Sequence, residues 1–297
     1  MAAHRGHSTH AMSKASTAAA RQTVLVADDD RTNRFAIAEM LRRAGYTVTE
    51  AGNGLEAVQQ IEKGNFDLVF LDIWMPSMSG LEVLARLRGG TAHPKVVVMT
   101  SDGTPETLLR AVREQAYEYV SKPCPPKQIV ELAERVLKAD AGAPIEVISA
   151  QPHWVELLIP CTREAAERLQ NFMMRLQAEL PDEQRDTIAQ AFRELGLNAV
   201  EWGGKLDPNR KVRSASVRSP RMILYRIQDP GTGFDPAQLK HAAIGQPEDD
   251  PTAHLKVRDE LGIRAGGFGL MMTRAMADEL IYNEARNEVI FVKYLNG

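Results

Sequence analysis

Two groups of residues along this chain have the types and spacing needed for phosphate chemistry. The first group combines carboxylates, a hydroxyl and an amine, each following a short apolar stretch: Asp28, Asp29, Asp72, Thr100 and Lys122. Carboxylates that lie close together repel one another, and hard oxygen ligands with room for water and phosphate favour Mg²⁺. A carboxylate beside such a cation can attack a phosphoryl group, while the lysine pairs with the phosphate and the hydroxyl donates a hydrogen bond. This group predicts a site that receives a phosphoryl group.

The second group begins with Glu194 and Asn198, which are four residues apart in the sequence RELGLNAVEWG. This spacing places both side chains on one face of a helix. An amide oxygen and a nearby carboxylate suit a hydrated Mg²⁺ that carries phosphates. The pair therefore predicts one part of a nucleotide site.

Glycine-rich segments follow this pair. Asp229 ends a predicted strand, and Gly231 and Gly233 come after it in the sequence DPGTGF. These glycines let the backbone approach a flat base closely, and the carboxylate can accept a hydrogen bond from an exocyclic amine. Gly267 and Gly269 lead into a predicted helix, whose N-terminal amides can hold phosphate oxygens.

The first half of the chain must bring its polar residues together through its fold. Five apolar runs alternate with helical patterns: 23–27, 47–51, 66–71, 95–100 and 117–121. This alternation predicts an α/β domain over residues 23–138, with a doubly wound parallel sheet. The polar residues stand where the strands end, and the carboxyl ends of such strands share one edge of the sheet, where ligands bind.

The second half has a different order of elements. A linker is predicted at 139–150, rich in Ala, Gly and Pro, and an α+β sandwich at 151–297. Its predicted strands are 154–160, 212–219, 222–229, 280–285 and 288–295, and its predicted helices are 162–180, 181–203 and 269–279. Helices grouped on a mixed or antiparallel sheet account for this order.

Bulk properties narrow the function. A length of 297 residues fits two domains, and a net charge of -3 disfavours a nucleic-acid or membrane-surface partner. Cys124 and Cys161 stand far apart, which suits a reducing cytoplasm. No apolar run is long enough to span a bilayer. Residues 1–22 lack acidic residues and bulky apolar surface, so we interpret them as a disordered tail, including their three histidines.

Residues 23–138 resemble the receiver domain of bacterial response regulators. The resemblance implies that Asp72 is the phosphoacceptor. It also implies that Asp28 and Asp29 bind Mg²⁺ together with the main-chain carbonyl of Trp74.

The same resemblance implies a switch. Thr100 corresponds to the switch hydroxyl, and Tyr119, three residues before Lys122, corresponds to the switch aromatic. The bond between Lys122 and Pro123 resembles one that is cis in this family.

Residues from about 152 to 297 resemble the ATP-binding domain of histidine kinases, gyrases, Hsp90-type chaperones and mismatch-repair ATPases. Within that group the resemblance is closest to bacterial anti-sigma-factor serine kinases. It implies Asn198 as Mg²⁺ ligand, Glu194 as base or water-positioning carboxylate, and Asp229 as adenine reader. The nucleotide-loop positions that it implies are Gly231, Gly233, Gly267 and Gly269.

Two features depart from that pattern. Trp202 stands where a histidine commonly follows the asparagine box, and a lid over 244–264 carries an acidic insert, QPEDDP. A basic run at 210–221 is interpreted as the solvated face of a hairpin, with a nucleic-acid patch as the alternative.

Two functions remain open. In the first, a sensor histidine kinase or phosphotransfer protein phosphorylates Asp72, and the ATP-binding domain acts as a serine/threonine kinase on a downstream protein. An external donor is expected because no histidine lies in a dimerising helix pair. In the second, the domain is a binding switch that sequesters a sigma factor or its antagonist, with ATP bound but little catalysis. A nucleic-acid-dependent ATPase is disfavoured by the charge, and a homodimer is expected through the last receiver helix.

Overall fold

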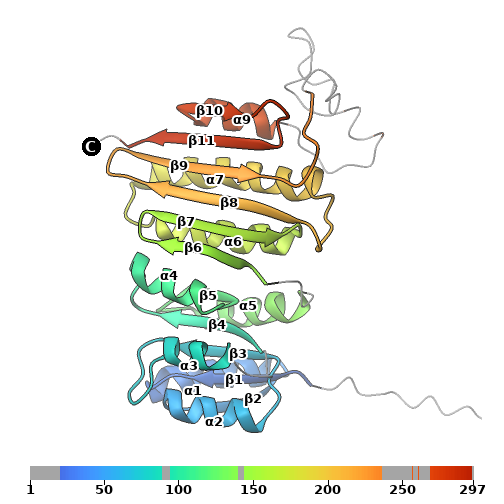
Figure 1. The fold of residues 1–297 in the computed structure, drawn as a ribbon. Helices are drawn as coiled ribbons and strands as arrows, with labels where there is room; N and C mark the ends of the chain where they lie inside the picture. The colour runs from blue at the N-terminus through green and yellow to red at the C-terminus, as the bar shows by residue number, and fades with distance from the viewer. Residues whose placement is uncertain are drawn as a thin grey trace, which may run out of the picture.

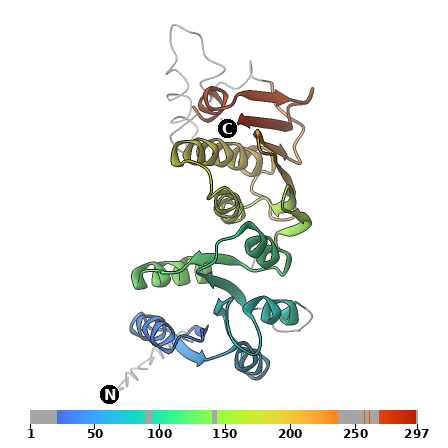
Figure 2. The same ribbon diagram turned by 90° about the vertical axis from the view of Figure 1, so that its left-hand side faces the viewer.

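The chain forms two β-sheets, each with its own helices, arranged one beyond the other along the long axis of the molecule (Figure 1). The computed structural model describes residues 21–88, 94–139, 144–235, 256, 260 and 268–295. Within these residues the first half builds a five-stranded sheet and the second half a six-stranded sheet. The view turned by 90° shows the same end-to-end arrangement (Figure 2).

The first domain is a doubly wound parallel sheet with strand order β2-β1-β3-β4-β5. Its strands are β1 (Thr23–Ala27), β2 (Thr47–Ala51), β3 (Leu68–Asp72), β4 (Lys95–Thr100) and β5 (Glu118–Ser121). Its helices are α1 (Arg31–Arg43), α2 (Gly54–Lys63), α3 (Gly80–Leu87), α4 (Pro105–Arg113) and α5 (Pro126–Lys138). The predicted fold class of this half is confirmed.

Alternate residues of each strand enter different cores. Val24 and Val26 of β1 pack with helices α1 and α5, whereas Leu25 and Ala27 pack with α2, α3 and α4. Both faces of the sheet are therefore covered, and all four side chains are fully buried.

Helix α1 begins at the acidic run. The carboxylate of Asp30 accepts hydrogen bonds from the main-chain amides of Thr32 and Asn33, so it caps the helix. Asp28 and Asp29, which precede Asp30, lie at the edge of the sheet. Phe35 and Leu55, which follow the helical spacing of α1 and α2, are 58% and 46% exposed rather than buried.

The second domain is an antiparallel sheet with order β10-β11-β9-β8-β7-β6 and helices on one face (Figure 1). Its strands are β6 (Glu146–Gln151), β7 (Trp154–Pro160), β8 (Lys211–Arg218), β9 (Met222–Gln228), β10 (Glu279–Tyr282) and β11 (Glu288–Tyr294). Its helices are α6 (Arg163–Leu176), α7 (Asp182–Asn198), the π-helix η1 (Ala199–Gly203) and α9 (Gly269–Met276). Strand β6 begins inside the predicted linker.

Aromatic rings join the sheet of the second domain to its helices. Tyr225 of β9 packs against Phe192 of α7, with ring centroids 4.8 Å apart, and against Phe291 of β11 at 6.3 Å. Ile223, Tyr225 and Ile227 alternate toward the helices and are buried. The helix that carries Glu194 and Asn198 is therefore held firmly on the sheet.

The two domains touch along α6. This helix and strand β6 contact α4 of the first domain, and Arg113 of α4 donates a hydrogen bond to the carbonyl of Ala150. Among the helices that the structure describes, none combines the length and apolar character required to cross a membrane.

Candidate functional site

The acidic pocket lies at the carboxyl ends of β1 and β3. Asp28 is fully buried and Asp72 is 4% exposed. One carboxylate oxygen from each of Asp28, Asp29 and Asp72 lies within 4.8 Å of the other two. Lys122, which directly follows β5, places its Nζ 2.8 Å from Asp28 Oδ2 and 2.6 Å from Asp72 Oδ2. The fold thus gathers residues almost a hundred positions apart, as predicted.

Burial and charge oppose each other in this pocket. Burial raises the pKa of Asp72, although Lys122 acts to lower it. Burial alone would lower the pKa of Lys122, but its hydrogen bonds to the two carboxylates raise it. Asn33 Nδ2 donates to Asp28 Oδ2 at 2.6 Å, and Arg34 donates to the carbonyl of the same residue. Three carboxylates against one ammonium leave a donor set that suits a hard divalent cation.

The predicted switch residues occupy separate positions. Thr100 is 1% exposed, and its hydroxyl donates to the carbonyl of Asp102 at 2.8 Å. Tyr119 is buried at the contact with the second domain. The main-chain amide of Trp74 lies 3.4 Å from Asp72 Oδ1, which brings this residue to the pocket. The peptide bond between Lys122 and Pro123 is cis.

The second candidate site starts on α7. Glu194 and Asn198 lie in the last two turns of this helix, and the chain continues directly into η1. Short π-helical segments are frequent at functional sites, because the extra residue changes the direction of the side chains that follow. At the end of η1, a Cβ added to Gly203 would overlap the carboxylate of Asp229. Glycine is therefore required where η1 meets the Asp229 loop.

The loop that follows β9, from Asp229 to Gly233, is held in a turn by the carboxylate of Asp229. The amide of Gly231 donates to Asp229 Oδ1 at 2.7 Å. Burial raises the pKa of Asp229, against the effect of this hydrogen bond and of Arg210. Gly233 has φ +85, and a Cβ there would overlap the carbonyl of Ala285, so both features require glycine.

Two further residues hold this loop in place: Asn287, which the sequence interpretation did not single out, and Arg210, which it placed only in the basic run at 210–221. Asn287 Nδ2 donates to the carbonyl of Gly231 at 3.0 Å, and the main-chain carbonyl of Asn287 accepts from the amide of Asp229 at 2.8 Å. Arg210 donates to the carbonyl of Pro230. Asn287 ends the turn between β10 and β11, so the last hairpin braces the loop. The residue types alone gave little signal, since asparagine and arginine are common in turns.

Helix α9 approaches α7 at its first residue. A Cβ added to Gly269 would overlap the carboxylate of Glu194, so this carboxylate lies against the start of α9. Trp202 of η1 is 45% exposed. Gly267 lies outside the described residues, as does the predicted lid over 244–264 except for Lys256 and Glu260.

Comparison with known proteins agrees with this two-part architecture. Residues 24–134 match the family described as Response regulator receiver domain, and residues 159–293 match the Histidine kinase-like ATPase domain. The chain is also 33% identical over 225 residues to the Phosphate regulon transcriptional regulatory protein PhoB of Pseudomonas aeruginosa, which covers 72% of this chain and 96% of PhoB. The chain belongs to the response regulators.

Other relatives match the receiver half of this response regulator. The DNA-binding transcriptional regulator NtrC of Azospirillum brasilense is 33% identical over 118 residues, which is 40% of this chain and only 24% of the length of NtrC. Among solved structures, the chemotaxis protein CheY4 of Vibrio cholerae is 28% identical and covers 39% of this chain and 99% of its own, with a TM-score of 0.38.

The structure of the response regulator groups the predicted residues into two sites. In the receiver domain it brings together Asp28, Asp29, Asp72 and Lys122, with Thr100 at the neighbouring strand end. In the ATPase domain it joins Asp229 and Gly231 to the end of η1, and Glu194 to Gly269. Tyr119 is the predicted residue that lies apart from both groups, at the domain contact. The roles of these residues stay predictions.

Proposed function

We propose that this response regulator receives a phosphoryl group on Asp72 and, in response, transfers phosphate from ATP to a downstream protein. The observation that carries the proposal is the position of Glu194. Its carboxylate lies against the first residue of α9, one helical turn before Asn198 on α7. A carboxylate at that place can serve a phosphoryl transfer, and the acidic pocket around Asp72 on the same chain would supply the input.

In the receiver domain, Mg²⁺ held by the three carboxylates and the carbonyl of Trp74 would neutralise charge on the incoming phosphate. An oxygen of Asp72 attacks phosphorus, and the bond to the donor histidine of a sensor kinase or phosphotransfer protein breaks. Lys122, which already lies 2.6 Å from Asp72, pairs with the transferred group. The Thr100 hydroxyl turns from Asp102 toward the new phosphoryl oxygens.

In the ATPase domain, Asp229 would accept a hydrogen bond from the adenine amine, and the side-chain oxygen of Asn198 would hold the Mg²⁺ that accompanies the phosphates. The glycines Gly231 and Gly233 admit the nucleotide close to the backbone. A serine or threonine hydroxyl of the partner attacks the terminal phosphorus as the bond to ADP breaks. Its proton passes to Glu194.

The resemblance to anti-sigma-factor serine kinases suggests a partner-switching pathway, in which the substrate is an antagonist of an anti-sigma factor. We further propose a cytoplasmic location, since Cys124 and Cys161 are both free thiols. A homodimer through α5 is part of the same proposal.

A phosphotransfer assay tests this function. Host extract is incubated with the protein, Mg²⁺ and ATP labelled on the terminal phosphate, and labelled proteins are separated. We expect a labelled partner, and complete loss of that label with Asn198→Ala. Asn209→Ala is the matched control, because Asn209 bonds to Asp207 in a turn outside the site. ATP binding without any labelled partner would overturn the kinase function.

The exposed Trp202 favours one alternative, a binding switch. A half-exposed indole on η1 gives a partner an aromatic anchor next to the nucleotide site. In this alternative the ATPase domain sequesters a sigma factor or its antagonist, and ATP supports its shape. A partner that Glu194→Ala protein retains as well as the wild type does, and that Trp202→Ala protein loses, would favour this function over the kinase.

A further inference from the structure

The antiparallel sheet of the ATPase domain has its described helices on one face, and its other face is turned toward the viewer in Figure 1. Successive side chains of a strand point to opposite faces. Because Ile223, Tyr225 and Phe291 are buried in the core beneath the helices, Leu224 and Val292 point away from that core. We call the face that carries Leu224 and Val292 the open face.

An apolar row crosses the open face. It consists of direct cross-strand partners on neighbouring strands: Trp154 of β7, Val217 of β8, Leu224 of β9 and Val292 of β11. Trp154 is 47% exposed, and Ile281 and Tyr294, near the end of the row, are 50% and 48% exposed. Large apolar side chains gathered on one exposed face mark an interaction surface, whereas scattered ones do not.

The charged side chains beside this row are paired within the sheet. Arg213 Nε lies 2.6 Å from Glu156 Oε1, and Arg226 Nη2 lies 2.7 Å from Glu288 Oε2. A face with an excess of one charge repels a copy of itself, and pairing of the charges removes that repulsion. The open face is therefore compatible in charge with its own copy.

The candidate nucleotide site lies on the other side of the sheet. Glu194 and Asn198 belong to α7, which packs on the helix-covered face and contacts α9. A protein bound to the open face is separated from Glu194 by the sheet itself. The open face is therefore badly placed for a substrate whose hydroxyl group must reach Glu194.

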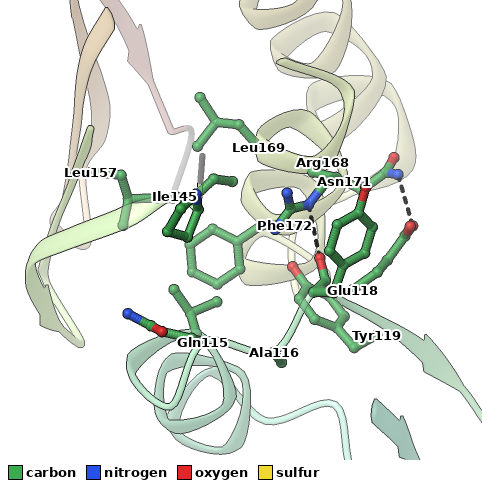
Figure 3. Close-up of a pocket in the computed structure, with 13 residues that line it drawn as sticks. Gln115, Ala116, Glu118, Tyr119, Ile145, Leu157, Arg168, Leu169, Asn171 and Phe172 are labelled. Atoms are coloured by element: carbon green, nitrogen blue, oxygen red, sulfur yellow. Dashed lines mark hydrogen bonds between the residues drawn. The ribbon is translucent and has the colours of Figure 1, made fainter. Parts of the chain in front are cut away.

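The receiver domain meets the ATPase domain through helix α6 and the edge strand β6, away from the apolar row. Three hydrogen bonds run from α6 to the β5 region: Arg168 to the carbonyl of Tyr117 at 2.8 Å, Asn171 to Glu118 Oε1 at 3.3 Å, and Arg175 to Ser121 Oγ at 2.6 Å (Figure 3). A partner can therefore bind the open face while the two domains of the chain stay in contact.

The open face has the size of a stable contact. Six strands spaced about 4.8 Å apart, with about six residues each at about 3.3 Å per residue, span about 24 by 20 Å. Each partner in a standard protein–protein interface buries about 800 Å² of accessible surface, which is of the same order.

We propose that the open face is a contact between two copies of this chain, in which a two-fold axis packs the apolar row of one copy against that of the other. Sheets that pack face to face are a stable arrangement, and identical chains pair most often about a two-fold axis. The proposal goes beyond the proposed function, because the open face takes no part in nucleotide binding. It is also separate from a contact through α5, which belongs to the receiver domain.

Sedimentation velocity of the full chain at about 50 μM tests the contact, since standard-size interfaces have dissociation constants from micromolar to picomolar. We expect a dimer. Leu224→Arg places like charges in the centre of the contact and should raise the dissociation constant at least about tenfold. Trp154→Arg should act in the same direction.

Leu55→Arg is the matched control, because Leu55 of α2 is 46% exposed, close to the exposed fraction of Trp154, and lies in the other domain. It should keep the wild-type dimer. An equimolar mixture of the Leu224→Arg and Leu224→Glu proteins should form dimers where neither protein does so alone, because opposite charges then meet. Restored dimers also show that both variants fold.

A wild type that stays monomeric at this concentration overturns the proposal. A dimer that withstands both Leu224→Arg and Trp154→Arg overturns it too, and assigns the contact to α5 if Glu131→Arg on that helix separates the copies. A monomer whose labelled partner is lost with Leu224→Arg assigns the open face to the partner protein instead. Asn198→Ala should stay dimeric, so failure of the kinase function and failure of this contact give different results.

Discussion

The two proposed phosphate-handling sites of this molecule are built in opposite ways. The receiver pocket is a cluster of charged side chains, with Asp28, Asp72 and Lys122 paired at 2.6–2.8 Å. The proposed nucleotide site instead contains glycines at positions where a side chain would overlap a neighbouring carboxylate. Gly203 and Gly231 border Asp229, and Gly269 borders Glu194. The receiver pocket therefore depends on charged side chains, whereas the proposed nucleotide site depends on the absence of side chains at its glycines.

This difference follows from the chemistry that each site must perform. A phosphoacceptor needs a nucleophile and cations within contact distance, which side chains at strand ends provide. A nucleotide site must admit a flat base and a chain of phosphates, which requires the backbone itself to come close. Substitutions in the receiver pocket should therefore impair function by changing its charge. Substitutions in the nucleotide site should impair function by filling space that the ligand or the backbone needs.

The largest effect is expected at the nucleophile. Asp72→Asn should abolish the acid-labile phosphate formed from acetyl phosphate and Mg²⁺, because the amide cannot attack phosphorus. Phosphate-affinity electrophoresis measures this. Asp67→Asn, at the opposite end of β3 where the carboxylate bonds to Thr23, should keep labelling. Labelling that persists in Asp72→Asn would place the acceptor elsewhere.

In the nucleotide site, the largest steric effect is expected at Gly203. Gly203→Ala drives a methyl group into the Asp229 carboxylate, at a cost of about 1–3 kcal/mol, or about fivefold to hundredfold in nucleotide affinity. Gly196→Ala on α7 is the control, since its added Cβ meets nothing within 4 Å. It should leave binding intact and raise stability by up to about 1 kcal/mol. Equal effects of the two alanines on ATP titration would contradict a steric site.

The two cysteines, one in each domain, should differ in their reactivity toward alkylating reagents. Burial raises the pKa of Cys161, below the Asp229 loop, to about 11, and also raises the pKa of the partly exposed Cys124. Because the thiolate is the reactive form, iodoacetamide at pH 8 should modify Cys161 at least about tenfold more slowly than Cys124. The Cys161 rate should rise about tenfold per pH unit toward pH 11. Mass spectrometry after timed quenching measures both rates, and a faster Cys161 would contradict its burial.

A smaller effect is expected at the brace of the loop. Asn287→Ala leaves the carbonyl of Gly231 without its side-chain donor, which costs about 1 kcal/mol and weakens nucleotide binding about fivefold. Asn209→Ala removes an asparagine of another turn and should change nothing. An Asn287→Ala protein with wild-type affinity would show that the loop keeps its shape without this hydrogen bond.

The sequence predicted the receiver pocket well because a polar residue that directly follows a buried apolar strand must lie at the end of that strand, at the sheet edge. Asp72 and Thr100 end β3 and β4, and that position alone aims them at the sheet edge. The doubly wound sheet and the α+β sandwich follow from the same apolar patterns and are confirmed.

Contacts between distant segments were not predictable in the same way. The side chain of Asn287 donates to a main-chain carbonyl 56 positions away, and a main-chain acceptor carries no sequence signal. Arg168, Asn171 and Arg175 have the pattern of an ordinary solvated helix face, and only the packing of two domains reveals their acceptors. The basic run at 210–221 is different: the hairpin interpretation fits, since Arg213 and Arg218 pair with Glu156 and Glu179.

The order of the strands has a consequence for handling this protein. β5 is the last strand of the first sheet, β6 is the last strand of the second, and both lie at the contact between the domains. Strand edges that lose their cover are templates for pairing with other chains. Cleavage of the chain between residues 139 and 144 would leave each half with such an edge beside newly exposed Tyr119 and Phe172. Separated halves should therefore aggregate more readily than the intact chain, so proteolysis is itself a hazard to its solubility.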